Sequence, residues 1–138
     1  MSARGVGAGN FSVRAVAPKD MPKYLAAGDV GISFIKRCFS KLASSPTKNG
    51  EYLACGLPIL INAGIGDSDR LAQESEAAVL VEDVGKQGFE RAWSEIEGLL
   101  NDQLIRAKAR ELAQQEFDLV TVGGERYAQL YEALCDTN

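Results

Sequence analysis

The segment at residues 44–58 constrains the fold most, because both of its ends carry the signals that begin and end a short helix. Ser45 is a favourable N-cap, and Pro46 suits the first helical position, where its missing N–H costs nothing. Gly56 can adopt the left-handed conformation that closes a helix, and a proline two residues later prevents continuation. We therefore predict a helix over residues 46–55.

Apolar segments with the pattern of strands alternate with helical patterns along the chain. The candidate strands are residues 11–16, 29–35, 59–62 and 77–81. The candidate helices are residues 19–27, 46–55, 69–76, 88–100, 104–116 and 122–134. This alternation predicts an α/β fold, a Rossmann-like parallel sheet flanked by helices with right-handed crossovers. The glycine-rich residues 1–10 predict a disordered or irregular lead, so that residues 11–138 form a single domain.

The same patterns predict which segments are buried. Residues 29–35 and 59–62 are almost continuously apolar, as expected of strands covered on both faces of a parallel sheet. Within the helix predicted over residues 88–100, Trp93 falls on the apolar stripe. We interpret it as a core anchor rather than a platform for stacking bases.

The residue types that are missing exclude several kinds of chemistry. The chain has 138 residues and no histidine, which excludes a Ser-His-Asp triad, a Cys-His pair and any metal site that contains histidine. Its three cysteines have no C-x-x-C spacing, which indicates a reducing cytosol rather than a disulfide framework or a zinc site. No apolar run reaches the length of a membrane span, and the N-terminus lacks the pattern of a signal peptide. We expect a cytoplasmic protein.

Charge is distributed unevenly along the chain. The net charge of −4 argues against nucleic acid as a partner. Residues 36–48 contain no acid and carry four positive charges, which leaves −8 for the rest of the chain; the cations are Lys36, Arg37, Lys41 and Lys48. This segment is either a solvated loop that happens to be basic or a phosphate-facing loop that leads into the predicted helix.

The start of the helix at residues 46–55 has the features of a nucleotide site. Its first turn has free backbone N–H groups and the cation Lys48, a combination that can hold a phosphate. Glu51 lies five residues beyond Pro46, roughly 7.5 Å along the axis, where a carboxylate can accept hydrogen bonds from a ribose. Ligands of parallel sheets bind beyond the carboxyl ends of the strands, where Ser45 and the loop at residues 64–67 are expected to lie.

Two stretches of the sequence resemble a known family. Residues 24–31 (YLAAGDVG) and 45–58 (SPTKNGEYLACGLP) resemble the C-terminal domain of group 1 glycosyltransferases, which have the two-domain B-type fold. Residues 123–131 resemble the end of such chains, so the resemblance covers about residues 11–135. Its core is the pattern Lys-x-x-Glu-x-x-x-x-Gly-x-Pro.

In that family the C-terminal domain binds a nucleotide-activated sugar, the donor of the transfer reaction. The resemblance implies that Glu51 holds the ribose hydroxyls and that Lys48, with the backbone around Thr47, faces the diphosphate. It implies that the loop with Gly64, Gly66 and Asp67 borders the nucleotide or the sugar. The donor would be the substrate, with no metal or other cofactor, and uracil and guanine donors are both compatible.

The sequence also departs from the family pattern. Members often carry a glutamate eight residues before the ribose-binding one, and Ala43 stands there. The N-terminal domain that binds the acceptor is missing, as are the opening strand and helix of the donor domain. For the basic residue that binds phosphate in that part, only Arg4 and Arg14 are candidates. We therefore expect a fragment or shortened relative of a larger enzyme, without transfer activity by itself.

Other acidic residues have simpler explanations than catalysis. Asp67-Ser68-Asp69 matches a metal-binding motif of a different glycosyltransferase fold, but it opens a helix, and we interpret it as helix capping. Residues 74 and 76, and residues 95 and 97, are pairs of glutamates two apart on helices, which point away from each other. The alternative for Glu51 is a surface carboxylate that supports its own helix.

Two functional hypotheses remain. The chain is the donor-binding part of a sugar transferase, or it is a non-catalytic module that binds nucleotides or partners; activity with a partner domain supplied would distinguish them. The last helix carries an apolar stripe with no partner domain in the chain, formed by Tyr127, Leu130, Tyr131 and Leu134. In B-type glycosyltransferases this helix packs on the N-terminal domain. We expect the stripe to fold back onto the sheet or, as we favour, to mediate a homo-oligomer.

Overall fold

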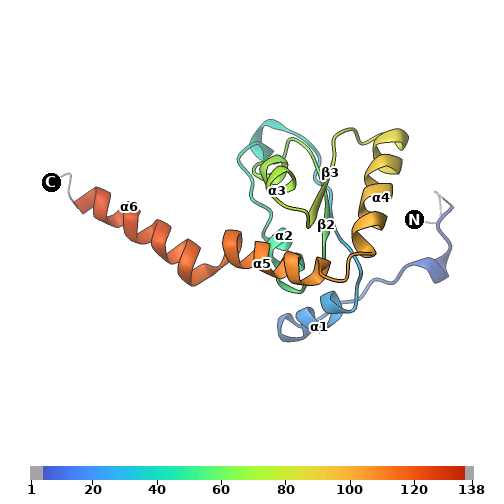
Figure 1. Ribbon diagram of the computed structural model, residues 1–138, viewed down its shortest axis with the longest axis horizontal. Coiled ribbons are helices and arrows are strands. Elements are labelled where there is room, and N and C mark those ends of the chain that lie inside the picture. The colour runs from blue at the N-terminus through green and yellow to red at the C-terminus, as the bar shows by residue number, and fades with distance from the viewer. Residues whose placement is uncertain (1–4, 136–138) are drawn as a thin grey trace.

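The computed structural model describes residues 5–135 and has the α/β fold that the sequence predicts (Figure 1). Three parallel strands form a Rossmann-like sheet in the order β1-β2-β3, with β1 at Gly31–Ser33, β2 at Ile59–Asn62 and β3 at Ala78–Val81. The helices are α1 at Met21–Ala26, α2 at Thr47–Ala54, α3 at Ser68–Glu74, α4 at Lys86–Leu100, α5 at Ile105–Phe117 and α6 at Glu125–Cys135. The predicted lead at residues 1–10 lies partly outside the described residues.

Helices cover both faces of the sheet (Figure 1). The sheet therefore separates the core into two clusters, one on each face. On one face α2, α3 and α5 pack against β2 and β3, through Leu53, Leu71, Ile105, Ala109 and Leu112. On the other face α4 packs through Ala92 and Ile96 against Leu60, Val79 and Val81. The central strand β2 is buried along its whole length, which confirms the prediction for residues 59–62.

The predictions for the first two strands were wrong in part. Residues 11–17 have no regular secondary structure and pair with no strand, and the side chain of Val13 is 86% exposed. The strand predicted over residues 29–35 is reduced to the three residues of β1, and Ile32 is half exposed. Since β1 is an edge strand and α4 packs over β2 and β3, the face of the sheet that Ile32 occupies is only partly covered.

Trp93 is not a core anchor. Its side chain is half exposed, and its indole N–H donates to Glu97 at 2.7 Å. The buried residues of α4 are Gly88, Ala92 and Ile96 instead. A Cβ atom at Gly88 would lie 1.9 Å from the carbonyl oxygen of Asp83, so α4 begins in close contact with the turn after β3. That contact turns Ala92 and Ile96 toward the sheet and leaves the indole outside.

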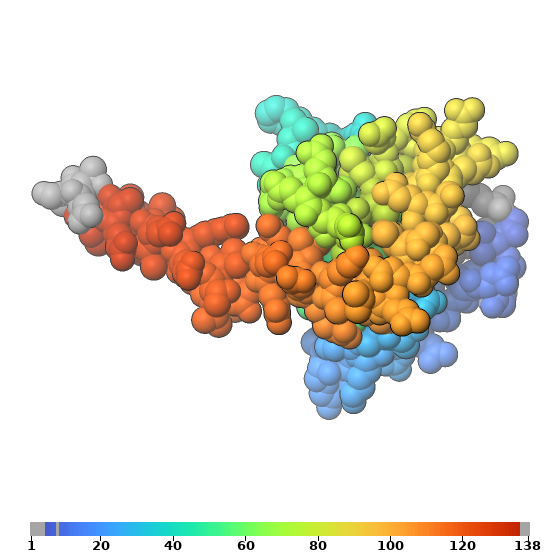
Figure 2. All heavy atoms as spheres, in the orientation of Figure 1, coloured from blue at the N-terminus to red at the C-terminus, as the bar shows by residue number. Residues whose placement is uncertain are grey.

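The C-terminal part of the chain leaves the body of the molecule. A π-helical segment at Leu119–Gly124 follows α5, and α6 then projects away from the rest of the structure (Figures 1 and 2). No residue of α6 is buried. Across the described residues 5–135, no helix is long and apolar enough to span a membrane.

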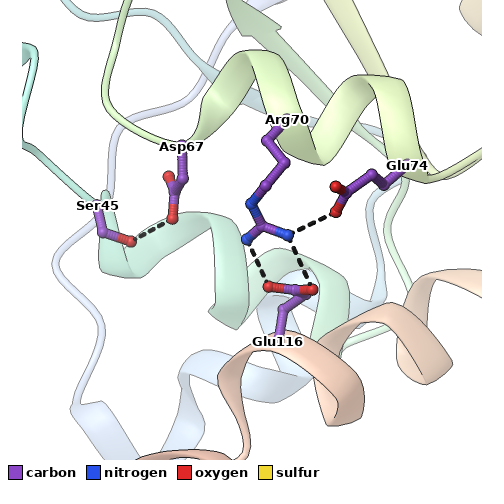
Figure 3. Close-up of polar contacts among 5 residues, drawn as sticks. All are labelled: Ser45, Asp67, Arg70, Glu74 and Glu116. Carbon is purple, nitrogen blue, oxygen red and sulfur yellow. Dashed lines mark hydrogen bonds and ion pairs between the residues drawn. The ribbon is translucent and has the colours of Figure 1, made fainter.

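An arginine on α3 links this helix to α5 across one face of the sheet (Figure 3). The Arg70 guanidinium donates two hydrogen bonds to Glu116, at 2.6 and 3.1 Å, and a third to Glu74 at 2.6 Å. The hydrogen bond from Arg70 lowers the pKa of Glu116 below its ordinary value. The lowered pKa means that the charged form of Glu116 stabilises the fold.

We expect Glu116→Gln to lower the free energy of unfolding by about 0.5–1 kcal/mol at neutral pH, since the pair is partly exposed to solvent. Because the pKa of Glu116 is lower in the folded state, this contribution is present above the ordinary glutamate pKa and is lost as the pH falls through the folded-state value. Urea unfolding as a function of pH measures it. Glu111→Gln, an exposed position on the same helix, is the control and should have little effect. A Glu116→Gln deficit that persists unchanged into acid would contradict this assignment.

Candidate functional site

The candidate site begins where the chain enters α2, beside the carboxyl ends of β1 and β2. α2 starts at Thr47, one residue later than predicted, and Pro46 occupies the N-cap position. The prediction that Ser45 caps this helix was wrong, since no side chain caps it. With proline at the N-cap, Ser45 lies one residue outside, and its hydroxyl donates to Asp67 Oδ2 at 2.9 Å (Figure 3). The N–H groups of the first turn therefore have no side-chain acceptor.

The other end of α2 is closed as the sequence predicts. Gly56 has φ +80°, in the left-handed region. Its N–H donates to the carbonyl of Leu53 at 2.8 Å, and the N–H of Leu57 donates to the carbonyl of Tyr52 at 3.0 Å. These two bonds form a Schellman motif. Leu57 is buried, so the motif fixes the angle at which the chain enters β2.

The loop after β2 packs tightly against the loop that precedes α2. Gly64 and Gly66 both have positive φ, +74° and +47°. The N–H of Gly66 donates to the carbonyl of Lys41 at 3.0 Å. A Cβ atom at Gly66 would lie 1.6 Å from the carbonyl oxygen of Ser44, a distance that no side chain tolerates. Glycine is therefore required where these two loops meet.

The interpretation of residues 67–69 as a capping motif was wrong in detail. Asp67 is at the N-cap position of α3, but its side chain makes no capping bond. One of its oxygens accepts from Ser45, and the other, Oδ1, is buried without a partner. Asp69 accepts instead from the N–H of Gly64 at 2.7 Å. Among residues 5–135 no three histidine, cysteine, aspartate or glutamate side chains form a group that could hold a metal.

One cation of the basic segment has a structural role. Arg37 donates to the carbonyl of Ala63 at 2.6 Å and to the carbonyl of Glu82 at 2.8 Å, so it ties the loop to the carboxyl ends of β2 and β3. The buried amide of Asn62 exchanges hydrogen bonds with the backbone of Ile35, which anchors the start of the loop. Neither role was predicted from the sequence, although a polar residue ending a buried strand is a usable signal.

Glu51 lies on the exposed side of α2 and lines two cavities. One, of about 470 Å³, is mostly apolar and is walled by the segment before α1, by α1 and by α2, through Val16, Pro18, Met21, Leu25 and Cys55. The other, of about 530 Å³, lies between α2 and α5 and includes Thr47, Arg110 and Phe117. The structure thus places Thr47 and Glu51 in one cavity.

The predicted residues therefore fall into two groups. Ser45, Gly66 and Asp67 meet where the two loops pack, with Gly64 beside Arg37. Thr47 and Glu51 line the flank of α2, and neither cavity that Glu51 lines includes the first group. The start of α2, with Lys48, connects the groups. Lys48 makes no ion pair within the described part of the chain.

Two buried polar side chains near the start of α2 have no hydrogen-bond partner among the described residues. Both polar atoms of the Asn49 amide are unpaired although the residue is 1% exposed, and the hydroxyl of Ser33 at the end of β1 is also unpaired. A buried unpaired amide costs about 1–3 kcal/mol. Asn49 was not among the residues predicted from the sequence. The signal was a polar residue one helical turn before Leu53, on the face of α2 that packs inward.

Comparisons of the chain with protein-family models, with curated proteins and with solved structures give no match. The structure supports a small α/β domain with a three-stranded parallel sheet and flanking helices.

Proposed function

We propose that this chain is the donor-binding domain of a B-type glycosyltransferase and holds a nucleoside-diphosphate sugar at the start of α2. The observation that carries the proposal is the helix start itself. It combines a first turn without a side-chain cap, the cation Lys48, which forms no ion pair with the residues that the structure describes, and a carboxylate, Glu51, one turn further along the helix. The first two features suit the diphosphate, and the carboxylate suits the ribose hydroxyls.

The surroundings of Glu51 support this arrangement. A ribose held by Glu51 would place its base beside the apolar cavity walled by Val16, Met21 and Leu25, which has the size of a small-ligand pocket. The loop of Gly64, Gly66 and Asp67 adjoins this helix start through Ser45 and would border the sugar.

Transfer to an acceptor would require another domain or chain. Ala43 offers no carboxylate where the family often has one. The apolar stripe of α6 is exposed and would pack against that domain or against a second copy of this chain. The alanine at position 43 favours one alternative, a module that binds the nucleotide without catalysing transfer.

We expect UDP or GDP to raise the melting temperature of the chain, and Glu51→Ala to weaken binding about 10- to 100-fold, since hydrogen bonds to a charged group contribute about 1.5–3 kcal/mol. The 2′,3′-dideoxy form of the nucleotide should bind the wild type more weakly. The Glu51→Ala variant should bind the dideoxy form and the normal nucleotide with equal affinity, because the variant has already lost the ribose contact. Thermal shift and calorimetric titration measure both effects.

The matched control is Glu95→Ala, an exposed glutamate on α4, on the other face of the sheet. It should leave nucleotide binding unchanged. Equal affinities of the wild type and Glu51→Ala would remove Glu51 from the site, and no stabilisation by any nucleoside diphosphate would refute the proposed function.

A further inference from the structure

The loop that precedes α2 exposes large apolar side chains among cations. Phe39 is 91% exposed and Leu42 is 61% exposed, although both residue types are usually buried. They lie in and beside a 3-10 turn at Phe39–Lys41. In Figure 2 the cyan atoms of this region project at the top of the body.

The loop is held in this position by its own hydrogen bonds. Arg37 binds two backbone carbonyls at the carboxyl ends of β2 and β3, and the carbonyl of Lys41 accepts from the N–H of Gly66. These bonds fix the loop on both sides of Phe39. The turn is therefore held in place by hydrogen bonds on both sides, and it exposes the ring of Phe39 to solvent.

Charge identifies the kind of surface that this turn fits. Residues 36–48 carry four cations and no acid, whereas the rest of the chain carries −8. Lys36 and Lys41 make no ion pair with any residue in the described part of the chain. A projecting loop with two apolar side chains among lysines suits an anionic lipid surface. The apolar groups can enter the headgroup region while the ammonium groups remain beside the lipid phosphates.

We propose that residues 36–44 dock this protein onto an anionic lipid surface, with Phe39 and Leu42 inserted between headgroups and Lys36 and Lys41 bound to their phosphates. The negative charge of the remaining chain is repelled by the same surface and so orients the molecule with this loop toward the lipid. Because the loop leads directly into α2, docking brings the start of α2 next to the bilayer. The proposal does not depend on nucleotide binding.

The test is sedimentation of the full chain with vesicles of phosphatidylcholine, with and without phosphatidylglycerol. We expect binding only to the vesicles that contain phosphatidylglycerol, and weaker binding as salt is raised. Phe39→Ser should lower the partition coefficient roughly tenfold or more, since an apolar side chain loses its insertion. Lys36→Gln and Lys41→Gln should each lower it about fivefold.

Matched controls separate this loop from other exposed parts of the chain. Val120→Ser removes an exposed apolar side chain elsewhere, and Lys19→Gln with Lys86→Gln removes two lysines outside the loop. None of these changes should affect partitioning. Equal losses in the controls and the loop variants would overturn the proposal, and so would equal binding to the two kinds of vesicle.

Cysteine labelling supplies a second readout. Cys38 is exposed within the loop, and its hydrogen bond with Ser40 lowers the pKa of the thiol, which favours labelling; Cys135 is exposed at the end of α6. With Cys55 replaced by alanine, an environment-sensitive fluorophore at Cys38 should shift to the blue on anionic vesicles, and one at Cys135 should not. A shift only at Cys135 would assign docking to α6 and overturn the proposal. Equally tight binding to single-stranded nucleic acid, unaffected by Phe39→Ser, would also overturn it in favour of general polyanion binding.

Discussion

Replacing Gly66 by alanine is expected to lower the free energy of unfolding by roughly 2–5 kcal/mol. Gly66 has φ +47°, and a Cβ atom there would lie 1.6 Å from the carbonyl oxygen of Ser44. The obstacle is backbone, so it cannot rotate away as a flexible side chain would. The two loops must separate, which breaks the hydrogen bond from Gly66 to Lys41 and disturbs the contact of Ser45 with Asp67.

Alanine substitutions at two other glycines serve as comparisons for this prediction. Gly64 has a positive φ but meets only the side chain of Arg37, at 3.2 Å, so Gly64→Ala should cost about 1–2 kcal/mol. Gly98 lies in α4 with nothing near its Cβ position, and Gly98→Ala should stabilise the protein by about 0.5–1 kcal/mol. Urea unfolding of the three variants measures the order. A Gly66→Ala midpoint equal to that of the wild type would show that the loops are not in contact.

The second large effect is expected at α6. We predict that two copies of the chain associate through this helix and that Leu130→Asp leaves a monomer. Tyr127, Leu130, Tyr131 and Leu134 form one stripe of the helix and are each between 54% and 65% exposed. The helix projects from the body (Figure 1). An apolar stripe of this kind is unusual on a soluble monomer, and two copies related by a two-fold axis can cover each other's stripes.

Sedimentation velocity over a range of concentrations measures the association. The control is Gln129→Asp, on the opposite side of α6, which should leave the dimer intact. Helix content gives a second readout, because a helix as short as α6 is marginal in water without packing. Far-UV circular dichroism of Leu130→Asp should therefore show less helix. A wild type that stays monomeric at high concentration, with Leu130→Asp unchanged in helix content and melting temperature, would exclude a packing role for the stripe.

The positions of most elements could be predicted because the signals for them are local. β2 occupies the predicted residues 59–62, and Gly56 closes α2 in the predicted left-handed conformation. α4 and α5 fall within two residues of their predicted bounds. The strand at residues 11–16 was wrong because a strand exists only if another strand pairs with it, and propensity contains no information about the partner.

Part of the candidate site was also predictable, because the signals for that part are local in the sequence. Lys48 and Glu51 lie on α2 as the helical spacing requires, so their relation to the helix start is determined by sequence. Ser45 was assigned as a cap because capping is a local rule. In the structure its partner is Asp67, 22 residues away, and it becomes available only when the two loops pack.

The sequence by itself determined where β2 lies, that Gly56 closes α2 and that the strands are parallel, because these depend on steric preferences and on spacing along the chain. Tertiary structure decided the rest. Arg37 could not be recognised as structural because its acceptors, the carbonyls of Ala63 and Glu82, lie 26 and 45 residues away. Trp93 is exposed because the close approach of Gly88 to Asp83 sets the rotation of α4. Both outcomes depend on contacts between distant segments, and such contacts exist only after the chain has folded.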